Sequence, residues 1–170
     1  MNLAAQRYTR SDDIDGSPRW SYMFGAICQL TVFPPLLLYD HHLCYYAVIS
    51  YFLKDTFTTT MHPSVHVHHF ACIFILGLGM YTYSMDIDAI TIAVILEIGS
   101  GGRSLVIMYP ELHAFHIHRI MYMSNVLGIL YNAHVSIWDI NKIISAMLVV
   151  VLCIVRQHDV LQRYERWVYG

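Results

Sequence analysis

Charge is scarce in this sequence. Only 13% of its 170 residues are charged, whereas about 25% is usual for a soluble domain. The composition therefore argues against an ordinary soluble domain. The ten Lys and Arg residues are scattered singly, and the net charge is −2. Nucleic acids are bound through clustered cations, so we do not expect a nucleic acid as a partner.

The sequence also lacks paired cysteines and a recognisable leader. Its four cysteines form no CxxC pair and lie in apolar stretches, so we interpret them as packing residues: Cys28, Cys44, Cys72 and Cys153. Residues 1–19 mix Arg with Asp and contain no apolar run. A secretory signal needs an apolar run and a transit peptide avoids acidic residues, so we expect no removable targeting segment.

Apolar residues, in contrast, make up 56% of the chain. A membrane-spanning helix needs about 20 residues, and the apolar residues fall into six segments: 22–39, 43–53, 65–83, 87–109, 115–138 and 140–155. The second is too short to cross a bilayer core of about 30 Å unaided. The sequence predicts an all-α, polytopic membrane helix bundle at 21–156, between a polar arm at 1–20 and an interfacial tail at 157–170.

Proline and glycine mark three places along these segments. Pro34 and Pro35 lie near the end of the first segment, where they would kink or terminate a helix. Pro63 fits the first turn of the third segment. Glycine at three of the four positions 99–102 permits either a close approach of two backbones or a break in the fourth segment.

The placement of the arginines predicts whether the chain crosses the membrane an even or an odd number of times. Three arginines precede the first segment and three follow the last: Arg7, Arg10, Arg19, Arg156, Arg163 and Arg166. Because positive residues collect on one side of a membrane, both termini are expected on that side. An even number of crossings follows, either six or four with two re-entrant segments.

Eleven histidines are the most unusual feature of the composition. His66 and His69 share a helix face at spacing i, i+3, as do His113 and His116, and such pairs can reach one metal ion. A di-iron site would need the boxes HxxxH and HxxHH, but the second box here reads HxHH. Haem ligation between two helices has no distinctive spacing in its favour. Most histidines lie at segment ends, where an interfacial role suffices, so we predict no metal and no cofactor.

Glu97 lies inside the fourth apolar segment, and Arg103 follows six residues later. A buried charge is usually paired. We therefore expect Glu97 to form a buried ion pair, or to bond to a tyrosine or histidine of another helix.

Three motifs in this order resemble the TLC family, named for the translocation-associated membrane protein, ceramide synthase and neuronal lipofuscinosis members. They are the stretch from Ser50 to Phe57 with Asp55, the pair His68-His69, and the stretch from Ile95 to Ser100 with Glu97. The resemblance covers about residues 43–155 and implies a bundle of about six spans. By resemblance to the synthases, His68 and His69 would carry out acyl transfer, one of them as general base. Asp55 would orient them or balance their charge.

The chain also departs from the synthase pattern, because residues 70–74 are wholly apolar and no Asp-Asp pair lies in the membrane region. These departures favour a non-catalytic accessory subunit of a large complex, with bound phospholipids and other membrane subunits as partners. We place it in the mitochondrial inner membrane, in a respiratory-chain or ATP synthase assembly. The alternative is a TLC-type lipid enzyme, with the endoplasmic reticulum as the alternative location. The residues expected to be buried polar contacts or lipid ligands are Glu97, Arg103, His66, His113 and His116.

Overall fold

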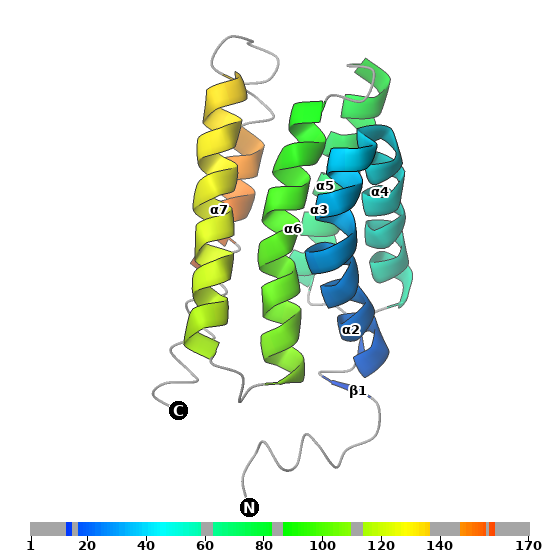
Figure 1. Ribbon diagram of the computed structural model, residues 1–170, viewed down its shortest axis with the longest axis vertical. Coiled ribbons are helices and arrows are strands. Elements are labelled where there is room, and N and C mark those ends of the chain that lie inside the picture. Colours follow the sequence, from blue (N-terminus) through cyan, green and yellow to red (C-terminus); the bar gives the residue numbers. More distant parts are fainter. Residues whose placement is uncertain are drawn as a thin grey trace, which may run out of the picture.

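The chain forms a bundle of helices that run side by side (Figure 1). The computed structural model describes residues 13–14, 17–58, 63–82, 87–109, 114–136, 147–155 and 157–158. These residues contain six helical segments, and they confirm the predicted helical fold class. A short antiparallel strand pair, β1 (Asp13–Ile14) and β2 (Ser17–Pro18), precedes the bundle.

The first helical segment is continuous through its prolines. It consists of α2 (Arg19–Ile27), the π-helical η1 (Cys28–Val32) and α3 (Phe33–Tyr39). The N–H of Phe33 donates to the carbonyl oxygen of Cys28, five residues earlier. This wider turn comes directly before Pro34 and Pro35, which lie in the first turn of α3, where a missing N–H is best tolerated. Termination at the prolines, one of the two predicted outcomes, is therefore wrong.

The second segment is longer than predicted. Helix α4 (His41–Thr58) has 18 residues, a length of about 27 Å at 1.5 Å per residue. Asp40 starts it, because its Oδ1 accepts hydrogen bonds from the N–H groups of His42 (2.9 Å) and Leu43 (3.1 Å), an N-capping arrangement. The boundary expected at residue 53 is wrong because the polar side chains that follow find partners inside the bundle and the helix continues.

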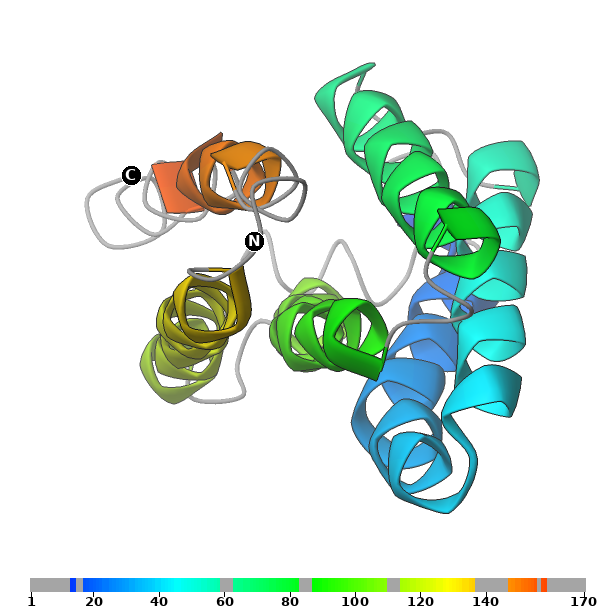
Figure 2. The same cartoon turned by 90° about the horizontal axis from the view of Figure 1, so that it is seen from above.

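Three further helices follow, namely α5 (Pro63–Thr82), α6 (Ile87–Met108) and α7 (Ala114–Ser136). Residues 147–155 form the last helical segment. Pro63 begins α5, as predicted. Viewed from above, α6 lies between the group α2 to α5 and the pair formed by α7 and the last segment (Figure 2). The central helix α6 therefore connects the two halves of the bundle.

Helix α6 is unbroken through its glycines. A Cβ on Gly101 would lie 2.7 Å from Leu30 Cγ and 3.1 Å from Gln29 Cβ. Glycine at this position lets η1 approach the α6 backbone closely. Of the two predicted outcomes for residues 99–102, the close approach is confirmed and the break is wrong.

The described residues contain two apolar core clusters. The larger joins the first segment to α4, α5 and α6, and the smaller joins α6 to residues 147–155. Cys28 and Cys44 belong to the larger cluster, Cys153 belongs to the smaller one, and Cys72 packs against the larger one. All four are free thiols. Their predicted role as packing residues is confirmed.

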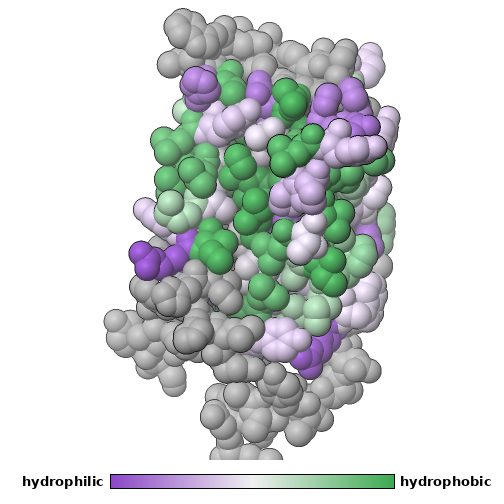
Figure 3. Space-filling model, in the orientation of Figure 1, coloured by the Kyte–Doolittle hydropathy of each residue, from purple (hydrophilic) through white to green (hydrophobic). Residues whose placement is uncertain are grey.

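Two helices in the described part of the chain are long and apolar enough to cross a membrane: Arg19–Tyr39 and Ile87–Met108. A shorter apolar helix covers His66–Tyr81. Apolar residues occupy much of the face seen in Figure 3, and hydrophilic residues gather toward its ends. Most of the predicted arm and tail lies outside the described residues.

The close approach at Gly101 can be tested with two matched substitutions. We expect Gly101→Ala to destabilise the protein by about 1–3 kcal/mol, because the new methyl group collides with Leu30. Gly77→Ala is the control, since a Cβ there meets nothing within 4 Å; it should be neutral or stabilising by up to about 1 kcal/mol. Thermal unfolding of both purified variants measures the difference. Equal melting temperatures would contradict the close packing.

Candidate functional site

Buried polar side chains gather where the first segment meets α4, α5 and α6. Among the described residues, eight polar or charged side chains are buried, and five of them come from these four segments: Ser21, Gln29, Asp55, His69 and Glu97. The other three lie on α7: Ser124, Asn125 and Asn132. We call the five residues, together with Tyr51 and Lys54 of α4, the polar centre.

Glu97 holds the α6 side of the polar centre and is only 3% exposed. Its Oε2 accepts a hydrogen bond of 2.5 Å from Gln29 Nε2, and its Oε1 accepts one of 3.3 Å from Ser100 Oγ. The sequence predicted a tyrosine, a histidine or a cation as partner. One partner that the structure shows is an amide from η1, a residue type that the sequence did not predict. Hydrogen bonds to both carboxylate oxygens offset the cost of burying this group.

Gln29 connects Glu97 to α4. Its Nε2 also donates to Tyr51 Oη at 3.0 Å, and the Tyr51 hydroxyl is hydrogen-bonded to the Asp55 side chain. Gly25 makes room for this arrangement, because a Cβ there would lie 2.9 Å from Tyr51 Oη. A chain of hydrogen bonds therefore runs from Glu97 on α6 to Asp55 on α4.

Asp55 is 7% exposed and forms an ion pair with the adjacent Lys54. Lys54 Nζ also donates to Ser21 Oγ at 3.1 Å. Three aromatic rings lie near the ammonium, with centroids 5.0–5.5 Å from Nζ: Phe24, Tyr51 and Trp20. Such rings attract a cation through their negative faces. The lysine is thus held where it can compensate the charge of Asp55.

His69 brings α5 into the polar centre and is 7% exposed. Its ring packs against Phe52 with centroids 5.1 Å apart. Charges and partial charges of Asp55, His66, Lys54 and Arg103 all act on it. Its Nδ1 is buried and has no hydrogen-bond partner in the described part of the chain. A buried imidazole on which a carboxylate charge acts, with one ring nitrogen open, can accept or donate a proton.

The two adjacent histidines have different environments. His68 is part-exposed, its ring centroid lies 6.4 Å from that of Phe52, and its Nε2 lies 3.7 Å from Cys72 Sγ. The centroids of His68 and His69 are 5.7 Å apart. His69, rather than His68, therefore belongs to the polar centre.

The structure places some of the predicted site residues in the polar centre. His69 packs against Phe52 of α4, and the charges of Asp55, His66 and Arg103 act on it. Glu97 is linked to Tyr51 of α4 through Gln29. His113 and the side chain of His116 lie outside the described residues. Within the described ranges, no three His, Cys, Asp or Glu side chains are grouped so that they could hold a metal ion.

Sequence reasoning missed Gln29, Tyr51 and Lys54. Gln29 carried a usable signal, since an amide inside an otherwise apolar span needs a partner in a neighbouring helix. Tyr51 and Lys54 lie in the stretch that resembles the TLC family, but residue type and spacing assigned them no role.

Comparison of the chain with protein-family models, with curated proteins and with solved structures gives no match. A function must therefore be argued from the residues and their geometry.

The ion pair at the polar centre yields a charge-compensation test. We expect Lys54→Met to destabilise the protein by about 2–4 kcal/mol, because it leaves the buried Asp55 carboxylate without its cation. The double variant Lys54→Met/Asp55→Asn should recover much of the loss, since asparagine carries no charge and can still bond to Tyr51. Denaturant unfolding of the wild type and both variants measures this. A double variant no more stable than Lys54→Met would contradict the interpretation.

Proposed function

We propose that this chain is a membrane-embedded protein of the TLC type that acts on lipids at its polar centre, with acyl transfer as its chemistry. The observation that carries the proposal is that His69 of α5 and Asp55 of α4 are both buried, and that the His69 ring packs against Phe52, one helical turn before Asp55. Acyl transfer to an amine or hydroxyl needs a base beside a group that orients it. These two side chains have the required chemistry.

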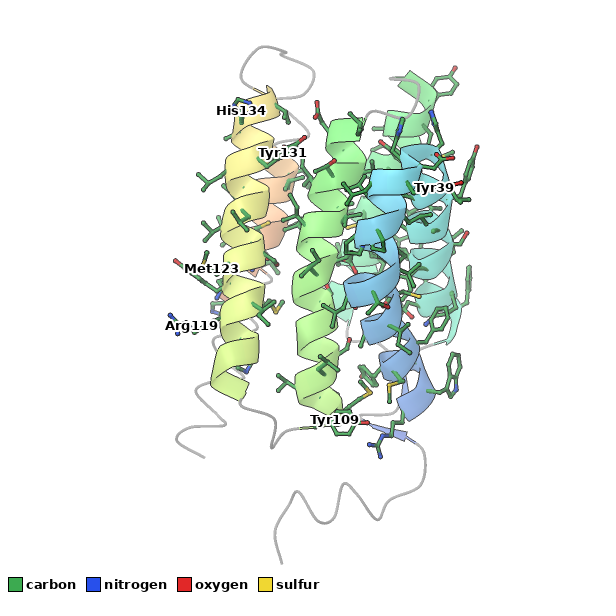
Figure 4. The ribbon with its side chains drawn as sticks, viewed as in Figure 1. Tyr39, Tyr109, Arg119, Met123, Tyr131 and His134 are labelled. Atoms are coloured by element: carbon green, nitrogen blue, oxygen red, sulfur yellow. The ribbon has the colours of Figure 1, made fainter. Side chains whose placement is uncertain are left out.

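The distribution of apolar side chains supports a membrane location. Among the described residues, 27 large apolar side chains are exposed while the polar centre is inside. Two helices have the length and composition of spans. Figure 4 shows Tyr39 and His134 toward one end of the bundle and Tyr109 and Arg119 toward the other, with Met123 between the ends of α7. Aromatic and polar residues are expected at the two water interfaces of a bilayer.

In the proposed reaction, His69 removes the proton from the attacking amine or hydroxyl of a lipid. The nucleophile forms a bond to the acyl carbon of the acyl-coenzyme A donor, and the thioester C–S bond breaks. The sulfur leaves as the thiol of coenzyme A with the proton that His69 had taken up. Asp55 stabilises the protonated imidazole by its charge. Tyr51, Gln29 and Glu97 act at a distance, because their hydrogen bonds hold Asp55 in position. Arg103 contributes a positive charge near His69 that a negative acyl donor would meet.

The acyl-transfer proposal predicts a large effect at one histidine. Replacing His69 with Ala should lower the transfer rate by about 10²–10⁴-fold, because the general base is lost, while the chain stays folded. His134→Ala is the matched control, since His134 is exposed at one end of α7. Incorporation of labelled acyl-coenzyme A into membrane lipids, with the wild type and both variants, measures the rate. Equal incorporation by the wild type and His69→Ala would contradict the proposal.

The second candidate function is a non-catalytic accessory subunit of a large membrane complex, in the mitochondrial inner membrane. The Lys54–Asp55 ion pair favours it, because Lys54 lies beside aromatic rings and already neutralises the Asp55 carboxylate. A neutralised carboxylate can stabilise helix packing without taking part in a reaction. In this role the polar centre packs helices and the exposed apolar residues contact phospholipids or other subunits. The predicted arm that would tie the chain to its partners lies outside the described residues.

The native mass of the protein separates the two candidates. Acyltransferase function predicts a monomer or dimer after gentle extraction from the source membrane, whereas accessory function predicts migration with a large, defined complex. Native electrophoresis followed by mass spectrometry of the co-migrating proteins measures this. Migration in such a complex together with full incorporation by His69→Ala would replace the first candidate with the second.

A further inference from the structure

The side-chain oxygen of Gln29 is the second open polar atom of the polar centre. Gln29 is 3% exposed, and its Oε1 is buried with no hydrogen-bond partner among the residues that the structure describes. A buried carbonyl oxygen without a donor loses the hydrogen bonds that water would provide. In a native structure such an atom needs an explanation, and a ligand that supplies the donor is one.

The orientation of this amide follows from its neighbours. The carboxylate of Glu97 accepts hydrogen bonds, so Gln29 must turn its nitrogen toward it, and the same nitrogen serves Tyr51. Both contacts hold Nε2, which leaves Oε1 facing away from them. Oε1 lies 3.8 Å from the position of a Cβ on Gly25, so the absence of a side chain there leaves this oxygen less crowded.

The backbone conformation at Gln29 also supports a ligand-binding role. Gln29 lies in η1, a π-helical turn of five residues within an otherwise α-helical segment. Such turns are rare and often occur at functional sites. This turn places Gln29 against both α4 and α6, as its bonds to Tyr51 and Glu97 show.

We propose that Gln29 Oε1 binds the hydroxyl group of a lipid, and so makes Gln29 a specificity-determining residue of the polar centre. The inference rests on the proposed lipid function and names the group that is recognised. A neutral carbonyl oxygen offers one acceptor and no charge, which suits a single neutral O–H donor. Asp55 is already paired with Lys54, and both carboxylate oxygens of Glu97 already accept hydrogen bonds. Gln29 Oε1 is therefore the acceptor beside them that is open to a new donor.

The experiment uses two probes with the same chain, which differ in whether the oxygen carries a donor hydrogen or a methyl group. Oleyl alcohol carries an O–H group, and oleyl methyl ether has the same chain and oxygen without it. Competition between them for the full-length purified protein in detergent, followed by native mass spectrometry, gives their relative affinity. We expect a preference of about 5- to 10-fold for the alcohol, the effect of one buried hydrogen bond.

Two variants assign the preference to Gln29. Gln29→Leu should reduce it to about one, because leucine has a similar size and no acceptor. Thr31→Val is the matched control: Thr31 lies in the same η1 turn, is exposed, and its hydroxyl donates to the Ile27 carbonyl oxygen. This variant should keep the wild-type preference.

Each contrary result has a distinct meaning. A preference that persists in Gln29→Leu, or equal binding of both probes by the wild type, would overturn the role of Gln29 and leave the role of His69 standing. Equal binding of both probes by the wild type overturns the role of Gln29 even if Gln29→Leu does not fold. Failure of the wild type to bind either probe would overturn this inference, whereas the incorporation of labelled acyl groups decides separately whether the proposed lipid function stands.

Discussion

The burial of charged groups inside an apolar bundle is the constraint on which the rest of the structure depends. Glu97 and Asp55 would each be costly in such surroundings without partners. Their partners come from other helices or from the same turn, and one hydrogen-bond chain through Gln29 and Tyr51 joins them. Because the bonds require particular distances, the first segment, α4 and α6 are held in one register.

Two glycines and one π-helical turn make this register possible. Gly25 and Gly101 leave space for Tyr51 and Leu30, and both contacts would be too close with any side chain at the glycine. The π-helical turn η1 carries Gln29 into the space between α4 and α6. A site built on rigid helices in this way is pre-organised, which is what a base or a recognition group needs to act without rearrangement.

Much of the fold was predictable from the sequence, because apolar segment length and proline position are local signals. The start of α5 at Pro63 agrees with expectation. The end of the second segment was wrong, since Lys54 and Asp55 look like the end of an apolar run until their mutual pairing is seen. Gln29 was missed as a partner of Glu97 because it is 68 residues away in the chain, and spacing rules do not reach that far.

By itself, the sequence determined the helical class, the apolar character of the segments and the residue types available for chemistry, because these follow from composition and short-range periodicity. Only the tertiary structure decided which histidine is buried beside a carboxylate, and that Gln29 turns its nitrogen to Glu97 and leaves its oxygen open. The physical reason is that these choices depend on contacts between helices distant in sequence, where packing and hydrogen-bond geometry select one arrangement from many.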